Sequence, residues 1–252
     1  MIVLAAIVGI CGGPCVQTIA DRTDAAVVAK AASQALGRLR ARDGGAGPAF
    51  DLQLAVRDVV SQPALRGTVI ASLPLSDRPI FTSLVDAGVA LRAMTPNKAT
   101  LPNWRIVPVP APATLRSEFD GAARASGVPW NVLAGIMLVE TRMGRIRGAS
   151  DAGALGPMQF LPSTWASYGR GDINSYRDSL RAAGRYLRAN GAATNLGRAL
   201  FAYNHDERYV FAVQTYARLM VRQPWIFDGF VKWRVIYRLG TGPVVLNEGY
   251  GV

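Results

Sequence analysis

The chain has 252 residues, half of them hydrophobic, and a formal net charge of +11. A chain of this length can bury one hydrophobic core of ordinary domain size. The basic residues are dispersed along the chain, which suits attraction to anionic polymers but does not identify nucleic acid as a partner. With two cysteines and one histidine, the sequence excludes most zinc sites and any histidine-activated nucleophile not built on His205. We therefore expect carboxylate chemistry, with no metal and no cofactor.

Residues 1–20 are expected to be a signal peptide or a membrane anchor. Ile2 to Ile10 form an apolar run that is too short to span a bilayer, and Thr18 to Ala20 offer a cleavage site of small residues. A positively charged segment before the run is missing, so a buried N-terminal strand or helix is the alternative. Export predicts an extracytoplasmic protein, secreted or associated with the cell envelope.

Residues 21–101 carry no motif that indicates a chemistry. The spacing of apolar residues predicts a helix from Thr23 to Leu39, with Thr23 or Asp24 as its cap. Leu52, Leu54 and Val56 alternate like a strand, whereas Phe81 to Leu91 fit a helix. We interpret this part as a partly helical region of unknown role.

Residues 102–112 contain four prolines and predict a stiff, extended linker at a domain boundary. Residues 113–222 have almost no strand signal, which predicts an all-α domain of short helices. The expected helices are Thr114–Ser126, Trp130–Thr141, Pro162–Tyr168, Ser179–Asn190, Gly197–Tyr203 and Glu207–Met220.

Residues 223–252 are interpreted as a C-terminal extension rich in aromatic residues. Pro224 to Phe227 and Lys232 to Tyr237 both look like strands. We expect this extension to pack on the helical domain or to extend its cleft.

Glu140 is the candidate catalytic residue. It ends an apolar run from Val132 to Val139 and lies four residues after Ile136 and seven after Leu133, so it shares their face of the helix. Apolar neighbours disfavour the charged carboxylate and raise its pKa, as a general acid for a glycosidic oxygen requires. Taken alone, a solvated glutamate at a helix end is the commoner interpretation.

Three motifs in order strengthen the catalytic interpretation. They are Glu140-Thr-Arg-Met-Gly144, then Ser150-Asp-Ala-Gly-Ala-Leu-Gly-Pro-Met-Gln-Phe160 with Pro162-Ser-Thr164, and then Ala202-Tyr-Asn204. Together they resemble the lytic transglycosylases with a goose-type-lysozyme-like fold, the soluble lytic transglycosylase group of glycoside hydrolase family 23, and most closely its actinobacterial secreted branch. The resemblance covers roughly Thr114 to Met220.

The resemblance implies a reaction with one carboxyl group. Glu140 would protonate the bond between N-acetylmuramic acid and N-acetylglucosamine and then, as carboxylate, take the proton of the muramic acid 6-hydroxyl. That hydroxyl attacks the anomeric carbon and gives a 1,6-anhydro product. The expected partner is therefore the peptidoglycan glycan strand, bound by a monomer.

The resemblance also implies substrate-binding residues. Ser150 corresponds to a serine near the acid, and Gly156 to a glycine where the backbone passes close to the sugar. Met158 and Gln159 correspond to a Met-Gln pair that lines the cleft. Tyr203 corresponds to a tyrosine whose hydroxyl approaches the acid, and Asn204 to an asparagine that shapes a sugar subsite. Without the motifs, these residues would be read as loop capping, turns and packing.

The chain departs from the family pattern at three places. Thr141 stands where serine is common, Pro157 stands where leucine is common, and His205-Asp206-Glu207 replace an Ala-Gly pair after the asparagine. The last change affects the sugar contacts expected around that turn.

Two other functions remain open from the sequence. A hydrolytic muramidase would need a base for water, which Asp151, Asp172 or Asp206 could supply. A non-catalytic glycan-binding protein of the envelope could use the same cleft. A nucleic-acid binder would explain the charge but not the motifs.

Overall fold

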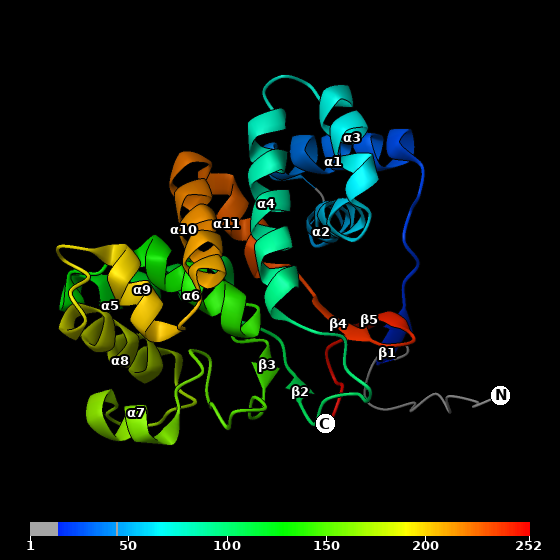
Figure 1. The fold of residues 1–252 in the computed structure, drawn as a ribbon. Helices are drawn as coiled ribbons and strands as arrows, with labels where there is room; N and C mark the ends of the chain where they lie inside the picture. Colours follow the sequence, from blue (N-terminus) through cyan, green and yellow to red (C-terminus); the bar gives the residue numbers. More distant parts are fainter. Residues whose placement is uncertain (1–14, 44) are drawn as a thin grey trace.

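A computed structural model describes residues 15–43 and 45–252 (Figure 1). In this part of the chain it contains eleven α-helices, one short 3₁₀ helix and five short strands. The predominantly helical architecture that the sequence predicts is confirmed.

The N-terminal region is a group of helices. It consists of α1 (Ala25–Arg40), α2 (Gly47–Ser61), the 3₁₀ helix Pro63–Leu65, α3 (Arg66–Ser72) and α4 (Arg78–Met94). The carboxylate of Asp24 accepts hydrogen bonds from the backbone amides of Ala26 and Val27, which confirms it as the cap of α1.

The strand predicted around Leu52 to Val56 was wrong, because these residues lie in α2. The buried apolar residues of this helix include Leu52, Ala55, Val56 and Val59, at spacings of three and four. The apparent alternation was part of a longer helical pattern.

Residues 113–222 form the six helices that the sequence predicts, with ends shifted by a few residues. They are α5 (Pro112–Ser126), α6 (Trp130–Thr141), α7 (Pro162–Tyr168), α8 (Tyr176–Ala189), α9 (Leu196–Tyr203) and α10 (Glu207–Arg222). Helix α6 is buried from Val132 to Leu138.

Helices α6 and α10 pack closely at Gly135. A Cβ atom at this position would lie 2.9 Å from the carbonyl oxygen of Val213, so glycine permits the close approach of the two helices. Helix α10 also packs against α4 of the N-terminal region (Figure 1).

The expected linker is extended but is tied to the rest of the fold. Its residues Arg105–Ile106 form β2, which pairs antiparallel with β3 (Ile146–Arg147) in the loop after α6. A second antiparallel sheet has the order β1-β5-β4 and joins β1 (Val16–Thr18), β5 (Gly242–Leu246) and β4 (Val235–Leu239).

The C-terminal extension was predicted correctly only in its second half. Strand β4 confirms the strand signal of Lys232 to Tyr237, whereas the strand predicted at Pro224 to Phe227 was wrong, because this segment begins helix α11 (Pro224–Val231). Pro224 occupies the first turn, where its missing amide hydrogen costs no helical hydrogen bond.

One cluster of buried apolar residues extends from Val28 in α1 to Trp233 after α11. It contains side chains of the N-terminal helices and of residues 113–222 alike. A smaller cluster holds Ile106 against the sheet residues Val235, Val244 and Leu246. The N-terminal region therefore shares its core with the helices of residues 113–222.

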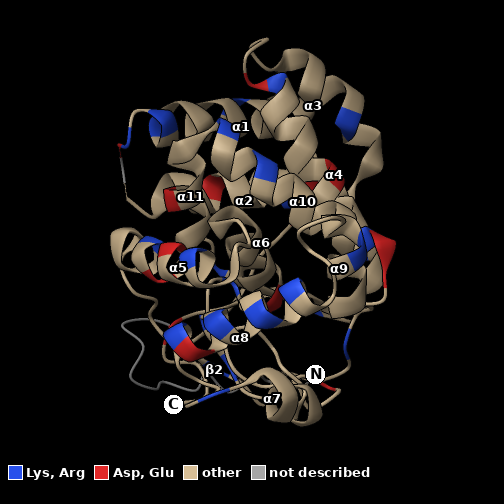
Figure 2. Ribbon diagram, turned by 90° about the vertical axis from the view of Figure 1, so that its left-hand side faces the viewer, with Lys and Arg blue, Asp and Glu red and all other residues tan. Residues whose placement is uncertain are grey.

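No helix within residues 15–43 and 45–252 is both long and apolar enough to cross a membrane. The apolar run Ile2 to Ile10, predicted as part of a signal or an anchor, lies outside the described residues. Figure 2 shows the basic residues dispersed over several helices, including a row along α8.

Candidate active site

Glu140 lies in the last turn of α6 and is half-buried. The next residues leave the helix through left-handed backbone conformations, with φ values of 53° at Arg142, 63° at Met143 and 82° at Gly144. The buried helix thus delivers Glu140 to its end, where part of the side chain is accessible.

The hydroxyl of Tyr209 donates a hydrogen bond of 2.7 Å to Oε1 of Glu140. The sequence predicted a hydroxyl near the acid at Tyr203, whose hydroxyl donates to the carbonyl oxygen of Met158 at 2.7 Å and not to Glu140. The substrate-binding role of Tyr203 stays a prediction. Tyr209 is buried in the first turn of α10, and no sequence motif singles it out.

Tyr203 and Tyr209 nevertheless form one aromatic pair beside the acid. Their rings are parallel within 6°, with centroids 6.4 Å apart. Burial, followed by the negative charge of Glu140, raises the pKa of both hydroxyls well above the usual value. Both tyrosines therefore stay neutral, and Tyr209 stays a hydrogen-bond donor, across the physiological pH range.

The environment raises the pKa of Glu140 from 4.5 to about 7. Burial is the largest cause, and the hydrogen bond from Tyr209 opposes it by favouring the carboxylate. A carboxyl group with this pKa is available both as a proton donor and as a proton acceptor near neutral pH.

Ser150 makes its hydrogen bonds within the loop that follows β3. Its hydroxyl accepts from the backbone amide of Ala154 at 3.0 Å, and its own amide donates to the carbonyl of Ala154 at 3.0 Å. Ser150 thus shapes the loop, and a bond to the acid stays a prediction.

Position 156 requires glycine because the backbone of another segment, at Ile173, lies very close to it. Its φ is 75°, and a Cβ atom there would lie 2.1 Å from the carbonyl oxygen of Ile173. Gln159, with φ of 50°, donates from Nε2 to the carbonyl of Gly156 at 3.0 Å. These two residues fix the turn, and their predicted sugar contacts stay untested.

Met158 lies in the hydrophobic core, and Asn204 lies at the end of helix α9. The side chain of Met158 is fully buried in the core, so the prediction that it lines a cleft was wrong. Asn204 ends α9 as its C-terminal cap, and its amide donates to the carbonyl of Leu200 at 3.2 Å. The half-buried side chain of Asn204 is compatible with the predicted sugar contact.

Thr141 is a positioning residue, a role that the sequence did not indicate. Its buried hydroxyl donates to the carbonyl of Pro157 at 2.7 Å and accepts from the amide of Gly144 at 3.0 Å. It therefore joins the residue after the acid to the loop of the second motif. Pro157, a second of the three departures from the family pattern, supplies the carbonyl.

The three aspartates considered as a second base are engaged elsewhere. Asp151 pairs with Lys98 at 2.5 Å, Asp172 accepts from the amide of Asn174 at 2.9 Å, and Asp206 caps α10. In the part of the chain that the structure describes, no group of three or more His, Cys, Asp or Glu side chains could hold a metal ion.

Comparison with protein families gives one match. Residues 117–218, less than half of the chain, match the model of the transglycosylase SLT domain. The matched segment runs from α5 to α10 and contains Glu140, the loop from Ser150 to Phe160 and both tyrosines. It supports the expected lysozyme-like fold. Neither the curated proteins nor the solved structures gave a match to this chain.

Proposed function

We propose that this protein is a peptidoglycan lytic transglycosylase that cleaves the β-1,4 bond between N-acetylmuramic acid and N-acetylglucosamine and leaves 1,6-anhydro-muramic acid ends. The half-buried Glu140, with a pKa raised to about 7 inside a segment similar to transglycosylase SLT domains, carries this proposal.

In the first step, protonated Glu140 transfers its proton to the bridging oxygen while the bond from this oxygen to the anomeric carbon of the muramic acid breaks. The electron pair of that bond leaves with the oxygen, and positive charge develops at the anomeric carbon. The product is a carboxylate, and Tyr209 donates its hydrogen bond to that carboxylate. Hydrogen bonds to charged acceptors are stronger than neutral ones, so Tyr209 stabilises the charge that develops in this step.

In the second step, the oxygen of the muramic acid 6-hydroxyl bonds to the same anomeric carbon, and Glu140 takes up the hydroxyl proton. The carboxyl group thereby returns to its starting state without a water molecule. A pKa near 7 suits both steps, because the group must lose and regain a proton at similar cost.

A single catalytic carboxyl group is consistent with the surroundings of the other aspartates. A hydrolytic muramidase would need a second carboxylate free to activate water. Asp206 is instead bonded to Arg208 and to the first turn of α10, and Asp151 to Lys98. These contacts are consistent with the intramolecular reaction.

We also propose that the protein acts outside the cytoplasm, because its substrate lies there and Ile2 to Ile10 resemble the apolar part of an export signal. We likewise propose that the protein belongs to the actinobacterial secreted branch of glycoside hydrolase family 23.

Mass analysis of the fragments released from purified peptidoglycan tests the reaction. We expect anhydro ends, lighter by one water molecule than the reducing ends a hydrolase would leave. Glu140→Gln should release no fragments while retaining the fold and most saccharide binding. Reducing ends would establish the muramidase, and binding without any release by the unaltered protein would establish the glycan-binding alternative.

A further inference from the structure

A cavity of about 400 Å³ lies between the N-terminal helices and the C-terminal sheet. Helices α2 and α4, strands β4 and β5 and Tyr216 of α10 line it, together with Arg142 at the end of α6. Much of its wall is apolar, through Val56, Val60, Leu91 and Ile236. Its volume is within the range of small-molecule binding sites.

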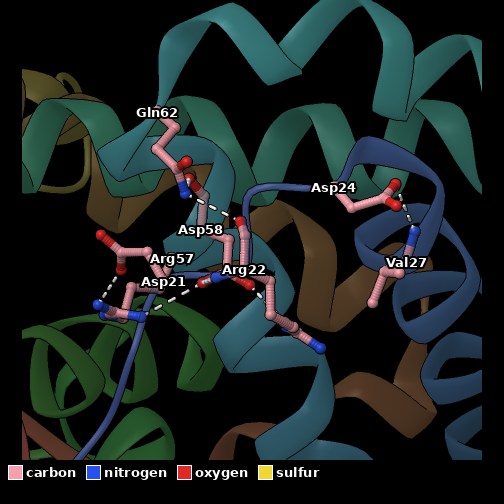
Figure 3. A network of polar contacts seen from close by, with 7 residues as sticks. All are labelled: Asp21, Arg22, Asp24, Val27, Arg57, Asp58 and Gln62. Atoms are coloured by element: carbon pink, nitrogen blue, oxygen red, sulfur yellow. Dashed lines mark hydrogen bonds and ion pairs between the residues drawn. The ribbon is translucent and has the colours of Figure 1, made fainter.

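The charged residues of the wall are predominantly cationic. Four arginines and one carboxylate, Asp21, line the cavity. Arg57 lies between Asp21 and Asp58 and pairs with both, so its charge is compensated (Figure 3). The other three, Arg92, Arg142 and Arg238, form no ion pair with any residue in the described ranges.

Arg142 and Arg238 bond only to neutral groups. Nη1 of Arg142 donates to the carbonyl of Leu138 at 2.8 Å, and burial lowers the pKa of this guanidinium. Nη2 of Arg238 donates to the carbonyl of Thr95. Charges that are partly removed from water without a counterion are unfavourable, so an anion in the cavity would stabilise them.

Two residues of the wall also carry buried donors without an acceptor among the described residues. They are Nη1 of Arg238 and Nε1 of Trp233. The side chain of Trp233 packs against Tyr216 and Phe230, and the residue is only 4% exposed. Buried donors usually have a partner, so both are candidates for hydrogen bonds to an oxygen-rich ligand.

We propose that this cavity binds a small ligand that carries an oxyanion, a carboxylate or a phosphate, on an apolar body. Arg142 and Arg238 hold the oxyanion, since a guanidinium matches the planar fork of acceptors that such a group offers. The apolar wall formed by Val56, Val60 and Leu91 receives the body of the ligand.

This site is separate from Glu140. Tyr216 follows Tyr209 by seven residues on α10, which places the two tyrosines about 10 Å apart along the helix axis. Tyr209 contacts Glu140, and Tyr216 lines the cavity. Glu140→Gln is therefore expected to leave ligand binding in the cavity unchanged.

Nuclear magnetic resonance of the tryptophan indole groups in the full chain tests the proposal. Trp233→Phe assigns the Trp233 signal among the five tryptophans. The probes are N-acetylleucine, its neutral amide N-acetylleucinamide, and inorganic phosphate. We expect N-acetylleucine to shift the Trp233 signal saturably and to bind at least about tenfold more tightly than the amide, which corresponds to about 1.4 kcal/mol.

Substitutions test the two arginines. Arg142→Met and Arg238→Met should each weaken binding of N-acetylleucine about tenfold, whereas Arg181→Met, on the exposed face of α8, should not. Phosphate binding as tight as that of N-acetylleucine would show that the oxyanion alone suffices. Equal binding of the acid and the amide, or no saturable shift with acid or phosphate, would overturn the proposal even if a variant failed to fold.

Discussion

Tyr209 and Glu140, which are 69 residues apart in the sequence, are joined by a hydrogen bond of 2.7 Å between the tyrosine hydroxyl and Oε1 of the carboxyl group. This bond and the burial of Glu140 act on its pKa in opposite directions. The proton affinity of the proposed acid therefore depends on a residue outside the three sequence motifs.

Tyr209→Phe is expected to raise the pKa of Glu140 further, because the bond that favours the carboxylate is lost. Turnover should fall about tenfold, since a hydrogen bond to a charged group contributes about 1.5 kcal/mol or more. The decline of activity at alkaline pH should move to higher pH. Rate-pH profiles of the variant and the unaltered protein measure both effects.

Tyr203→Phe is the matched control. It removes a hydroxyl that bonds to the carbonyl of Met158 and leaves the bond between Tyr209 and Glu140 in place. Its pH profile should stay close to that of the unaltered protein. A shift as large as that of Tyr209→Phe would assign the tuning to the aromatic pair as a whole.

Glu140 is expected to make the folded protein less stable as pH rises. Its pKa is about 7 when folded and close to 4.5 when unfolded. Between these values the unfolded chain has lost the proton that the folded protein still binds, so the free energy of unfolding falls with pH by up to about 3 kcal/mol. Below pH 4.5 and above pH 7 this contribution is constant.

Glu140→Gln removes this titration. Urea denaturation at pH 4 and pH 8 should show the variant gaining stability relative to the unaltered protein at the higher pH. A stability difference that is the same at both values would mean that the carboxyl group is not desolvated.

Thr141→Val should destabilise the protein by about 1 to 3 kcal/mol, because it leaves the buried carbonyl of Pro157 and the amide of Gly144 without their partner. Thr141→Ser keeps the hydroxyl and should recover most of this loss. Denaturant unfolding compares the two variants. Destabilisation by Thr141→Ser with no loss of stability in Thr141→Val would instead assign the role of Thr141 to its methyl group.

Gly156→Ala and Gly153→Ala separate two effects of a glycine. Both positions have φ near 80°, but an added Cβ meets the carbonyl of Ile173 at 2.1 Å only at Gly156. Gly153→Ala should cost about 1 kcal/mol for the backbone conformation, and Gly156→Ala roughly 2 to 3 kcal/mol more because the turn must move. Thermal unfolding gives the difference, and equal midpoints would refute the close contact.

Most helices of residues 113–222 could be predicted from sequence because of the spacing or run length of their apolar residues and because of local end signals, such as Pro162 at the start of α7 or Gly191 after α8. Short segments gave less information. Three alternating residues in α2 imitated a strand, and the aromatic run after Pro224 did not distinguish helix from strand.

The candidate acid was predictable, but its hydrogen-bond partner was not. Glu140 interrupts an apolar helix, which is a local signal. Tyr209 instead occupies an apolar position of α10 in step with Val213 and Tyr216, so its spacing indicates only packing. Its hydroxyl reaches Glu140 because α10 crosses α6, a tertiary relationship that the spacing of residues in one helix does not contain.

The continuous core predicts that residues 113–222 do not fold stably without the N-terminal helices. Helix α10 is buried against α6 and also against α4, so a fragment of residues 113–222 would expose the apolar face that contacts α4. Large exposed apolar faces favour aggregation and remove the burial that stabilises the fold. We expect this fragment to aggregate or to unfold at much lower urea concentration than the full chain, measured by circular dichroism and light scattering. A soluble fragment with the stability of the full chain would instead support the boundary predicted at residues 102–112.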